Sequence, residues 1–257
     1  MKRHHPLRDV FEKYQSTYER RGGKTYFRPL HEVLEFRLGR LPAWLDRIPK
    51  NARILDAGCA TGYLLGLLYE LGYTQLTGVD ISKEMTDTAR QRLPATIVIH
   101  CEDIFDFVTS LADESFDLIL FHQVIEHIPR EQIIDLLRHF HRCLSPGGWL
   151  SVTTPNAACV LAGCHVAGDI THVTAFNELS LKQVAEQAGF KPDAFEIVLT
   201  PPRLFWSWRH PHRAVLRLLN RARWHLNRFF HWSLIMLIDS RPMLLCREWE
   251  LQVLMRK

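Results

Sequence analysis

The stretch RILDAGCATGYLLGLLYELGYTQLTGVD, residues 53–80, decides the fold of this chain. The short apolar run at residues 54–55 predicts a buried strand, and a tight turn of small residues follows it. A helix is expected from near Thr61, and the apolar residues 76–79 predict a second buried strand that Asp80 closes. Strand, glycine turn, helix, strand and acid together predict a βαβ unit with a ligand site at the strand ends. The expected buried face of the helix consists of Leu64, Leu67, Leu68 and Leu71.

The turn has the chemistry of a cofactor cradle. Gly58, Ala60 and Gly62 are small, so the backbone can pass close to a ligand. The helix that follows directs free N–H groups and its positive dipole end at a carboxylate or phosphate. Asp80, at the tip of the second strand, is placed to accept hydrogen bonds from two ribose hydroxyls.

The spacing of the glycines separates two cofactor classes. A dinucleotide fingerprint needs its third glycine one position beyond Gly62, where Tyr63 stands. The pattern LDAGCATG, with GVD downstream, instead resembles the first motif of class I S-adenosylmethionine (SAM)-dependent methyltransferases. Ala60 stands where that family usually has glycine, and its side chain is small enough to fit. The resemblance implies that SAM is the cofactor.

The rest of the chain continues the pattern of this family. Further strands are expected at residues 96–100, 116–121, 149–153, 195–200 and 244–254, and helices at 83–93, 130–143 and 178–188. The segments FDLI and LSPGGWL also resemble methyltransferases, so the resemblance covers roughly residues 50–190. It implies a Rossmann-like α/β fold with seven strands, mostly parallel with an antiparallel last strand, and helices on both faces.

The expected cofactor contacts lie in the turn and at the strand ends. By resemblance, Asp103 hydrogen-bonds the exocyclic amine of adenine, although it also suits the cap of the helical turn after it. The predicted contacts are Asp56, Gly58, Ala60, Gly62, Asp80, Ile81, Asp103, Ile104 and His122.

Three residues near the ends of the fourth and fifth strands are the catalytic candidates: Glu126, His127 and His172. The sulfonium of SAM is already a good leaving group, so the protein must chiefly place a nucleophile and remove its proton. His127 or His172 is the expected general base, because histidine titrates near neutrality. Glu126 would orient that base or polarise the acceptor hydroxyl. The alternative is that Glu126 and His127 merely begin a helix beside the cofactor.

The same residues raise the question of a metal. The spacing Q-x-x-E-H with a distant H-x-x-x-F resembles metal-binding O-methyltransferases of ubiquinone biosynthesis and of small-RNA 2′-O-methylation, whose pattern is E-x-x-E-H. Gln123 replaces the first glutamate, and the loss of a carboxylate weakens a site for magnesium more than one for zinc. A divalent metal is therefore the less favoured alternative.

Composition and length set the organisation of the 257-residue chain. We expect an N-terminal helical leader or cap at 1–50, a SAM-binding core at 51–200, a basic insert at 201–240 and the final core strand at 241–257. The N-terminus lacks the apolar region of a signal peptide, and no apolar run is long enough to span a membrane. Six cysteines without a CxxC pair suit reduced thiols, so a cytoplasmic protein is expected.

The basic insert has no acidic residue between Glu196 and Asp239, but it holds seven arginines and four tryptophans. Arg213, Arg217 and Arg221 recur every four residues and share a helical face with Arg228. Leucine and phenylalanine occupy another face, a pattern typical of an interfacial membrane helix. Residues 203–238 are therefore expected to meet a membrane surface. The alternatives are a nucleic-acid surface and a lid or dimer contact.

These observations predict a SAM-dependent methyltransferase of the cytoplasm, peripheral on the inner membrane face. Its acceptor is expected to be a hydroxyl on a lipid-linked saccharide or a quinone-type molecule, because the TTPN, TH and AGF segments resemble methyltransferases of bacterial cell-surface glycan biosynthesis. The alternatives are an RNA 2′-O-methyltransferase and a SAM-binding, membrane-associated interaction protein without turnover. The sequence leaves the oligomeric state open.

Overall fold

A computed structural model describes residues 42–159, 162–198, 211–238 and 250–257 of the chain. Its centre is a seven-stranded sheet in the order β3-β2-β1-β4-β5-β7-β6. Neighbouring strands run parallel except where β7 pairs with β5 and β6, so β7 alone is antiparallel to the rest. The predicted Rossmann-like sheet is confirmed. The strands are β1 Arg53–Ala57, β2 Gln75–Asp80, β3 Val98–Cys101, β4 Phe116–His122, β5 Leu144–Pro155, β6 Phe195–Ile197 and β7 Glu250–Arg256.

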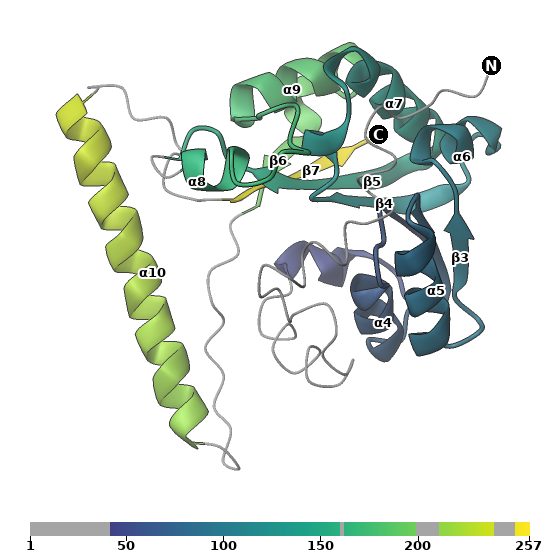
Figure 1. The fold of residues 1–257 in the computed structure, drawn as a ribbon, viewed down its shortest axis with the longest axis horizontal. Helices are drawn as coiled ribbons and strands as arrows, with labels where there is room; N and C mark the ends of the chain where they lie inside the picture. The colour runs from purple at the N-terminus through teal and green to yellow at the C-terminus, as the bar shows by residue number, and fades with distance from the viewer. Residues whose placement is uncertain (1–41, 160–161, 199–210, 239–249) are drawn as a thin grey trace.

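Helices cover both faces of this sheet (Figure 1). The helices α4 and α5 and the short 3-10 helix η2 pack on one face, and α6, α7 and α9 pack on the other. The helices are α4 Tyr63–Glu70, α5 Lys83–Arg92, α6 Ile104–Ser110, α7 Arg130–Cys143, α8 Ala162–Val166, α9 Glu178–Gln187 and α10 Pro211–Ile238. The 3-10 helices are η2 Ala43–Arg47, η3 Ile125–His127 and η4 Pro192–Ala194.

Side chains along the central strands point alternately to the two faces of the sheet, so each strand contributes to both halves of the core. On β1, Ile54 packs with α4 and α5, whereas its neighbour Leu55 packs with α6 and α7. On β4, Leu118 and Ile119 divide in the same way. Because each central strand is buried on both sides, its sequence reads as a continuous apolar run.

The strand order reverses between β1 and β4, since β2 and β3 extend the sheet to one side and β4 and β5 to the other. In open parallel sheets, the crevice outside the carboxyl ends of the strands at such a point is where ligands bind. The turn after β1 and the segment after β4 lie at this crevice. The fold therefore brings the glycine turn and the predicted catalytic residues to one edge of the sheet.

Several predicted boundaries need correction. α4 begins at Tyr63, close to the expected start, and it buries Leu65 together with Leu67 and Leu68, while Leu64 and Leu71 are half-buried against the same core. The third strand starts at Val98. The fifth strand, expected at residues 149–153, begins at Leu144 and so includes the SPGG segment, where the pairing with β4 shifts register between Phe116 and Leu118. The last strand runs Glu250–Arg256 and so ends beyond the predicted residue 254.

The basic insert forms the 28-residue helix α10, which stands beside the sheet rather than against it in Figure 1. Within the described part of the chain, none of the helices is both long and apolar enough to cross a membrane. The predictions for the leader at 1–41, for the insert at 201–210 and 239–240, and for strand residues 199–200 and 244–249 lie outside the described residues. Within the leader, Trp44 and Leu45 of η2 are buried in the core.

Candidate active site

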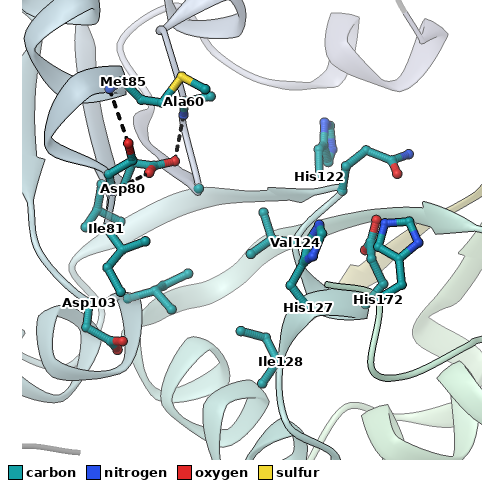
Figure 2. Close-up of a pocket in the computed structure, with 16 residues that line it drawn as sticks. Ala60, Asp80, Ile81, Met85, Asp103, His122, Val124, His127, Ile128 and His172 are labelled. Atoms are coloured by element: carbon teal, nitrogen blue, oxygen red, sulfur yellow. Dashed lines mark hydrogen bonds between the residues drawn. The ribbon is translucent and has the colours of Figure 1, made fainter. Parts of the chain in front are cut away.

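A cavity of about 310 Å³ lies at the carboxyl ends of β1, β2 and β4. Its two ends differ in chemistry: Figure 2 shows Asp80 and Asp103 toward one end and His127 and His172 toward the other, with Val124 between them. The lining comprises Gly58, Ala60, Val79, Asp80, Ile81, Ser82, Met85, Asp103, Ile104, His122, Gln123, Val124, Glu126, His127, Ile128 and His172.

Asp80 accepts hydrogen bonds from the glycine turn after β1 and from the segment that follows β2. Its Oδ2 accepts a hydrogen bond from the Ala60 N–H at 2.9 Å, and its Oδ1 accepts one from the Ser82 N–H at 2.8 Å. Burial raises the pKa of Asp80, and the two N–H donors act in the opposite direction. A carboxylate has about four acceptor sites, so both oxygens can still receive ribose hydroxyls.

The glycine turn is shaped by positive backbone angles. Gly58 has φ 87°, and a Cβ placed there would lie 2.3 Å from Cγ2 of Val124, a residue that lines the cavity. Ala60 also adopts the left-handed region, at φ 46°, which costs an alanine about 1 kcal/mol. The replacement of the family's usual glycine by Ala60 thus keeps the turn and its N–H bond to Asp80.

Asp103 caps a helix, as the sequence allowed, and it also lines the cavity. Its Oδ1 accepts the Phe105 N–H at 2.8 Å and so caps α6, while the residue also lines the cavity. Ile81, Met85 and Ile104 provide apolar surface beside it. An acid next to an apolar wall suits a flat heterocycle with an exocyclic amine.

The catalytic candidates come together from two distant segments. Glu126 and His127 belong to η3 after β4, and His172 lies on the loop between α8 and α9. That loop is held in place because the N–H groups of Val173 and Thr174 both donate to the carbonyl of Glu126, at 2.9 and 3.1 Å. The rings of His127 and His172 meet edge to face, with centroids 4.8 Å apart.

The hydrogen bonds of His127 indicate its tautomer. Nδ1 lies 3.2 Å from the carbonyl oxygen of Thr171, which can only accept, and 2.9 Å from the Thr171 hydroxyl. That hydroxyl donates to Asp169 at 2.7 Å. Nδ1 therefore carries the proton, and Nε2 is the basic nitrogen. The chain Asp169–Thr171–His127 orients the ring in the way that a third group orients a catalytic base.

The hydrogen bond of His172 indicates the same tautomer. Its Nδ1 lies 3.2 Å from the carbonyl oxygen of Val166 in α8, so Nδ1 is the donor and Nε2 keeps its lone pair. Two histidines thus offer Nε2 atoms at one end of the cavity.

Glu126 is a buried acid, with 2% of its surface exposed. Its Oε2 accepts the Thr154 hydroxyl at 3.1 Å, whereas its buried Oε1 has no hydrogen-bond partner within the described part of the chain. Burial raises the pKa of Glu126 to about 7, against the opposing effect of its hydrogen bonds. The nearby carboxylates of Glu250 and Asp169 contribute to the same rise. Near neutral pH this carboxyl can hold or release a proton.

The same three residues have the donor set of a metal site. One ligand atom from each of Glu126, His127 and His172 lies within 4.8 Å of the others. Two histidines and a carboxylate are a zinc ligand set, and metal-bound histidines usually donate their other N–H to a carbonyl or carboxylate, as both do here. Gln123, which stands where the metal-binding pattern has its first glutamate, donates its Nε2 to Glu250 at 2.7 Å. The residues fit a divalent metal of this kind.

The cavity contains most of the predicted site residues. The exceptions are Asp56 and Gly62: Asp56 is buried at the end of β1, and Gly62 lies where a Cβ would be 2.5 Å from Cδ1 of Leu93. Gly62 thus serves the packing of α4 on α5. The roles of the residues that line the cavity remain predictions.

The sequence analysis missed three residues that hydrogen-bond the catalytic candidates or their partners: Thr154, Thr171 and Asp169. The signals for them are weak, because a threonine in TTPN and a D-x-T sequence in a loop have many other uses. Their role becomes visible only when the loop after β5 is folded against η3.

Comparisons with known proteins agree with this geometry. A family model described as a methyltransferase domain matches residues 26–194. The ubiquinone biosynthesis O-methyltransferase of Xanthomonas oryzae pv. oryzae (strain PXO99A) is 34% identical over 200 residues, which cover 74% of this chain and 81% of that protein. The enzyme of the same name from Paracidovorax citrulli is 31% identical over 137 residues, covering 51% of this chain but only 54% of that protein.

Among solved structures, a SAM-dependent methyltransferase from Archaeoglobus fulgidus aligns with a TM-score of 0.64 at 20% identity. The alignment covers 93% of this chain and all of the other, so the two share their fold. The matched family model spans β1 to β5, which carry the cradle and the catalytic candidates. This chain therefore belongs to the class I SAM-dependent methyltransferase family, whose cofactor is S-adenosylmethionine.

Proposed function

We propose that this protein transfers the methyl group of SAM to a hydroxyl oxygen of a lipid-borne acceptor. The observation that carries the proposal is the pair of Nε2 atoms of His127 and His172 at the end of the cavity away from Asp80. Each nitrogen is left basic by a carbonyl at Nδ1. A hydroxyl needs such a base, because it must lose its proton as the oxygen attacks.

One end of the cavity would bind the cofactor, and the other end would bind and deprotonate the acceptor. Bound SAM supplies a methyl group on a positively charged sulfur. Asp80 and Asp103 would hold its ribose and adenine, and Gly58 and Ala60 leave room for it. Val124 and Ile128 line the space before the histidines and reduce its access to water.

At the other end, His127 takes the proton of the acceptor hydroxyl on Nε2, and the resulting imidazolium keeps its Nδ1 proton bonded to Thr171. The Asp169 carboxylate stabilises this positive charge through the Thr171 hydroxyl. The buried Oε1 of Glu126 is available to accept a hydrogen bond from the acceptor.

The choice of acceptor is supported by the relatives and by the insert. The relatives named above are ubiquinone biosynthesis O-methyltransferases, which favours a quinone-type acceptor. An exposed apolar face on α10 suits an enzyme whose substrate resides in a membrane. A lipid-linked saccharide is the second acceptor that the sequence predicted, and it shares the attacking hydroxyl.

The test combines a simple probe with cell extracts. The protein is incubated with SAM and either a catechol carrying an isoprenoid tail or a lipid-linked oligosaccharide fraction. Mass spectrometry then looks for the addition of one methylene unit. We expect S-adenosylhomocysteine to appear together with a methylated hydroxyl on one of the two acceptors. Methylation of a nitrogen or carbon, or no turnover with cell lipids of any class, would contradict the proposal.

Two variants test the assigned base. His127→Ala is expected to bind SAM normally but to lose a factor of about 10² to 10⁴ in kcat, the usual contribution of a positioned base. Thr171→Val removes the hydroxyl that orients the ring, whereas Thr171→Ser keeps it. We expect a lower kcat and a displaced pH–rate profile for the valine variant only. Equal activity of valine and serine variants would remove Thr171 from the mechanism.

The metal alternative is separated by chelation. A divalent cation held by Glu126, His127 and His172 would lower the pKa of an acceptor hydroxyl directly. If EDTA abolishes turnover and zinc, magnesium or manganese restores it, the three residues act as ligands and not as a free base. Unchanged turnover in EDTA supports the base.

A further inference from the structure

The helix α10 exposes a continuous apolar face. Its most exposed large side chains include Leu226 at 68% and Phe230 at 63%. At 3.6 residues per turn, the exposed apolar residues other than Trp232 fall within about one third of the circumference. No described helix or strand packs along it (Figure 1). The members of this face are Val215, Leu218, Leu219, Ala222, Leu226, Phe229, Phe230, Met236 and Leu237.

Arginines border this face on both sides. Arg223 lies just beyond one edge, and Arg221 and Arg228 lie beyond the other. The Arg228 guanidinium sits 4.6 Å from the centre of the Trp224 ring, a cation–π pair on the side of the helix that faces away from the apolar residues. The chain from residue 197 to residue 238 contains no acid that could neutralise these charges.

We infer that the apolar face of α10 lies in the interfacial layer of an anionic lipid bilayer. Leucine and phenylalanine would enter the acyl boundary, and the bordering arginines would reach lipid phosphates. A 28-residue helix is about 42 Å long, which gives many such contacts in parallel. This docking deepens the proposed function, because it would bring the cavity to a lipid-borne acceptor.

Electrostatics argues against a second copy of the chain as the occupant. A two-fold dimer places the same patch against itself, so the arginine borders would face each other. Residues 197–238 provide no carboxylate to pair with them. Like charges across an interface are destabilising, whereas an anionic surface complements them.

The chemistry of the face also argues against a nucleic acid. Single-stranded RNA is bound by aromatic side chains that stack on bases, between basic groups that contact phosphates. Here most of the exposed apolar side chains are aliphatic, for example Leu219, Leu226 and Leu237. Aliphatic side chains gain little from bases but are readily buried among lipid tails.

The test is flotation of the full chain with vesicles, without substrate. One set is phosphatidylcholine alone, and the other is phosphatidylcholine mixed with anionic phosphatidylglycerol. Leu226→Glu places a charge near the centre of the apolar face. Asn227→Glu makes the same charge change at the next residue, which is exposed outside this face. The two variants therefore have the same net charge on the same helix.

The wild-type protein is expected to float with anionic vesicles and much less with phosphatidylcholine. Leu226→Glu should lower the partition coefficient at least about tenfold and Asn227→Glu less than about twofold. Equal effects of the two variants, or no binding of the wild-type protein, would overturn the inference. So would a lipid-free dimer that only Leu226→Glu dissociates, or binding of a single-stranded RNA by a chain that does not float.

Failure of docking and failure of the proposed function give different results. Binding of S-adenosylhomocysteine, measured by calorimetry, shows that each variant is folded. Vesicle binding by a protein that methylates none of the acceptors sustains the docking inference alone. Turnover of a soluble catechol by a protein that never floats overturns the docking inference and leaves methyl transfer intact.

Discussion

The pKa of Glu126, raised to about 7 chiefly by burial, has a consequence for stability. Between the ordinary glutamate pKa of 4.5 and about 7, the folded protein retains a proton that the unfolded chain has lost. Stability falls with rising pH wherever the folded state binds more protons. The contribution of Glu126 is therefore fully present below pH 4.5 and is lost as the pH rises through about 7.

Glu126→Gln should remove this pH dependence. We expect the free energy of unfolding of the wild-type protein to fall, relative to that of Glu126→Gln, by up to about 3 kcal/mol between pH 4.5 and 8. Urea unfolding in EDTA at several pH values measures this difference. Glu131→Gln, an exposed acid in the first turn of α7, is the matched control and should follow the wild-type curve. Parallel curves for wild type and Glu126→Gln would contradict the expectation.

Single residues were predicted from sequence where their roles are local. Asp103 caps α6, as its position before a helical turn predicted, and Asp80 meets the backbone of the glycine turn. Thr171 and Asp169 were missed because their partner, His127, lies about 40 residues away along the chain. Only the tertiary fold gives an isolated threonine this function.

At the scale of elements, the contact between α4 and α5 depends on Gly62. Gly62 and Gly72 both have positive φ, 77° and 87°, but their surroundings differ. A Cβ at Gly62 would lie 2.5 Å from Leu93 and 3.2 Å from Ala89, whereas a Cβ at Gly72 would meet nothing within 4 Å.

The two alanine variants therefore separate backbone strain from packing. Gly72→Ala should lower the free energy of unfolding by about 1 kcal/mol, the cost of a left-handed alanine. Gly62→Ala bears this cost and an overpacking cost of about 1 to 3 kcal/mol more. Urea unfolding of both variants gives the difference. Equal losses would mean that α5 moves aside freely and that the missing Cβ at Gly62 has no energetic importance for the helix pair.

Elements were predictable where periodicity was unambiguous. α7 runs from Arg130 to Cys143 as predicted, because its apolar stripe is long and the turns around it are clear. On α4 the predicted leucines all pack toward the core, but Leu65 is buried as well, since a leucine-rich helix has apolar residues on almost every side. The fifth strand was predicted to start only at residue 149 because proline and glycine usually end strands, yet β5 includes the SPGG segment through an irregular register with β4.

At the scale of the whole molecule, the sequence predicted the sheet because its motifs recur at the strand ends. The relation of α10 to the core was not predictable in the same way. An amphipathic pattern specifies that one face is apolar, but the same pattern suits a protein core, a dimer or a membrane. The structure adds that this face is exposed within the described chain, which is the premise of lipid docking.

Cofactor binding is expected to stabilise the entire described fold, because the cavity joins the loops after β1, β2 and β4. S-adenosylhomocysteine at about 100 times its Kd should add about 2.7 kcal/mol, or roughly 5 to 10 °C in Tm for a chain of this size. NAD should add nothing, since Tyr63 replaces the third glycine of a dinucleotide fingerprint.

Asp80→Asn should lose most of the shift, because its amide nitrogen would face the Ala60 or Ser82 N–H. Asp87→Asn, on the surface of α5, should keep it. Stabilisation by NAD, or an undiminished shift in Asp80→Asn, would mean that the glycine turn and Asp80 do not bind the cofactor as the geometry indicates.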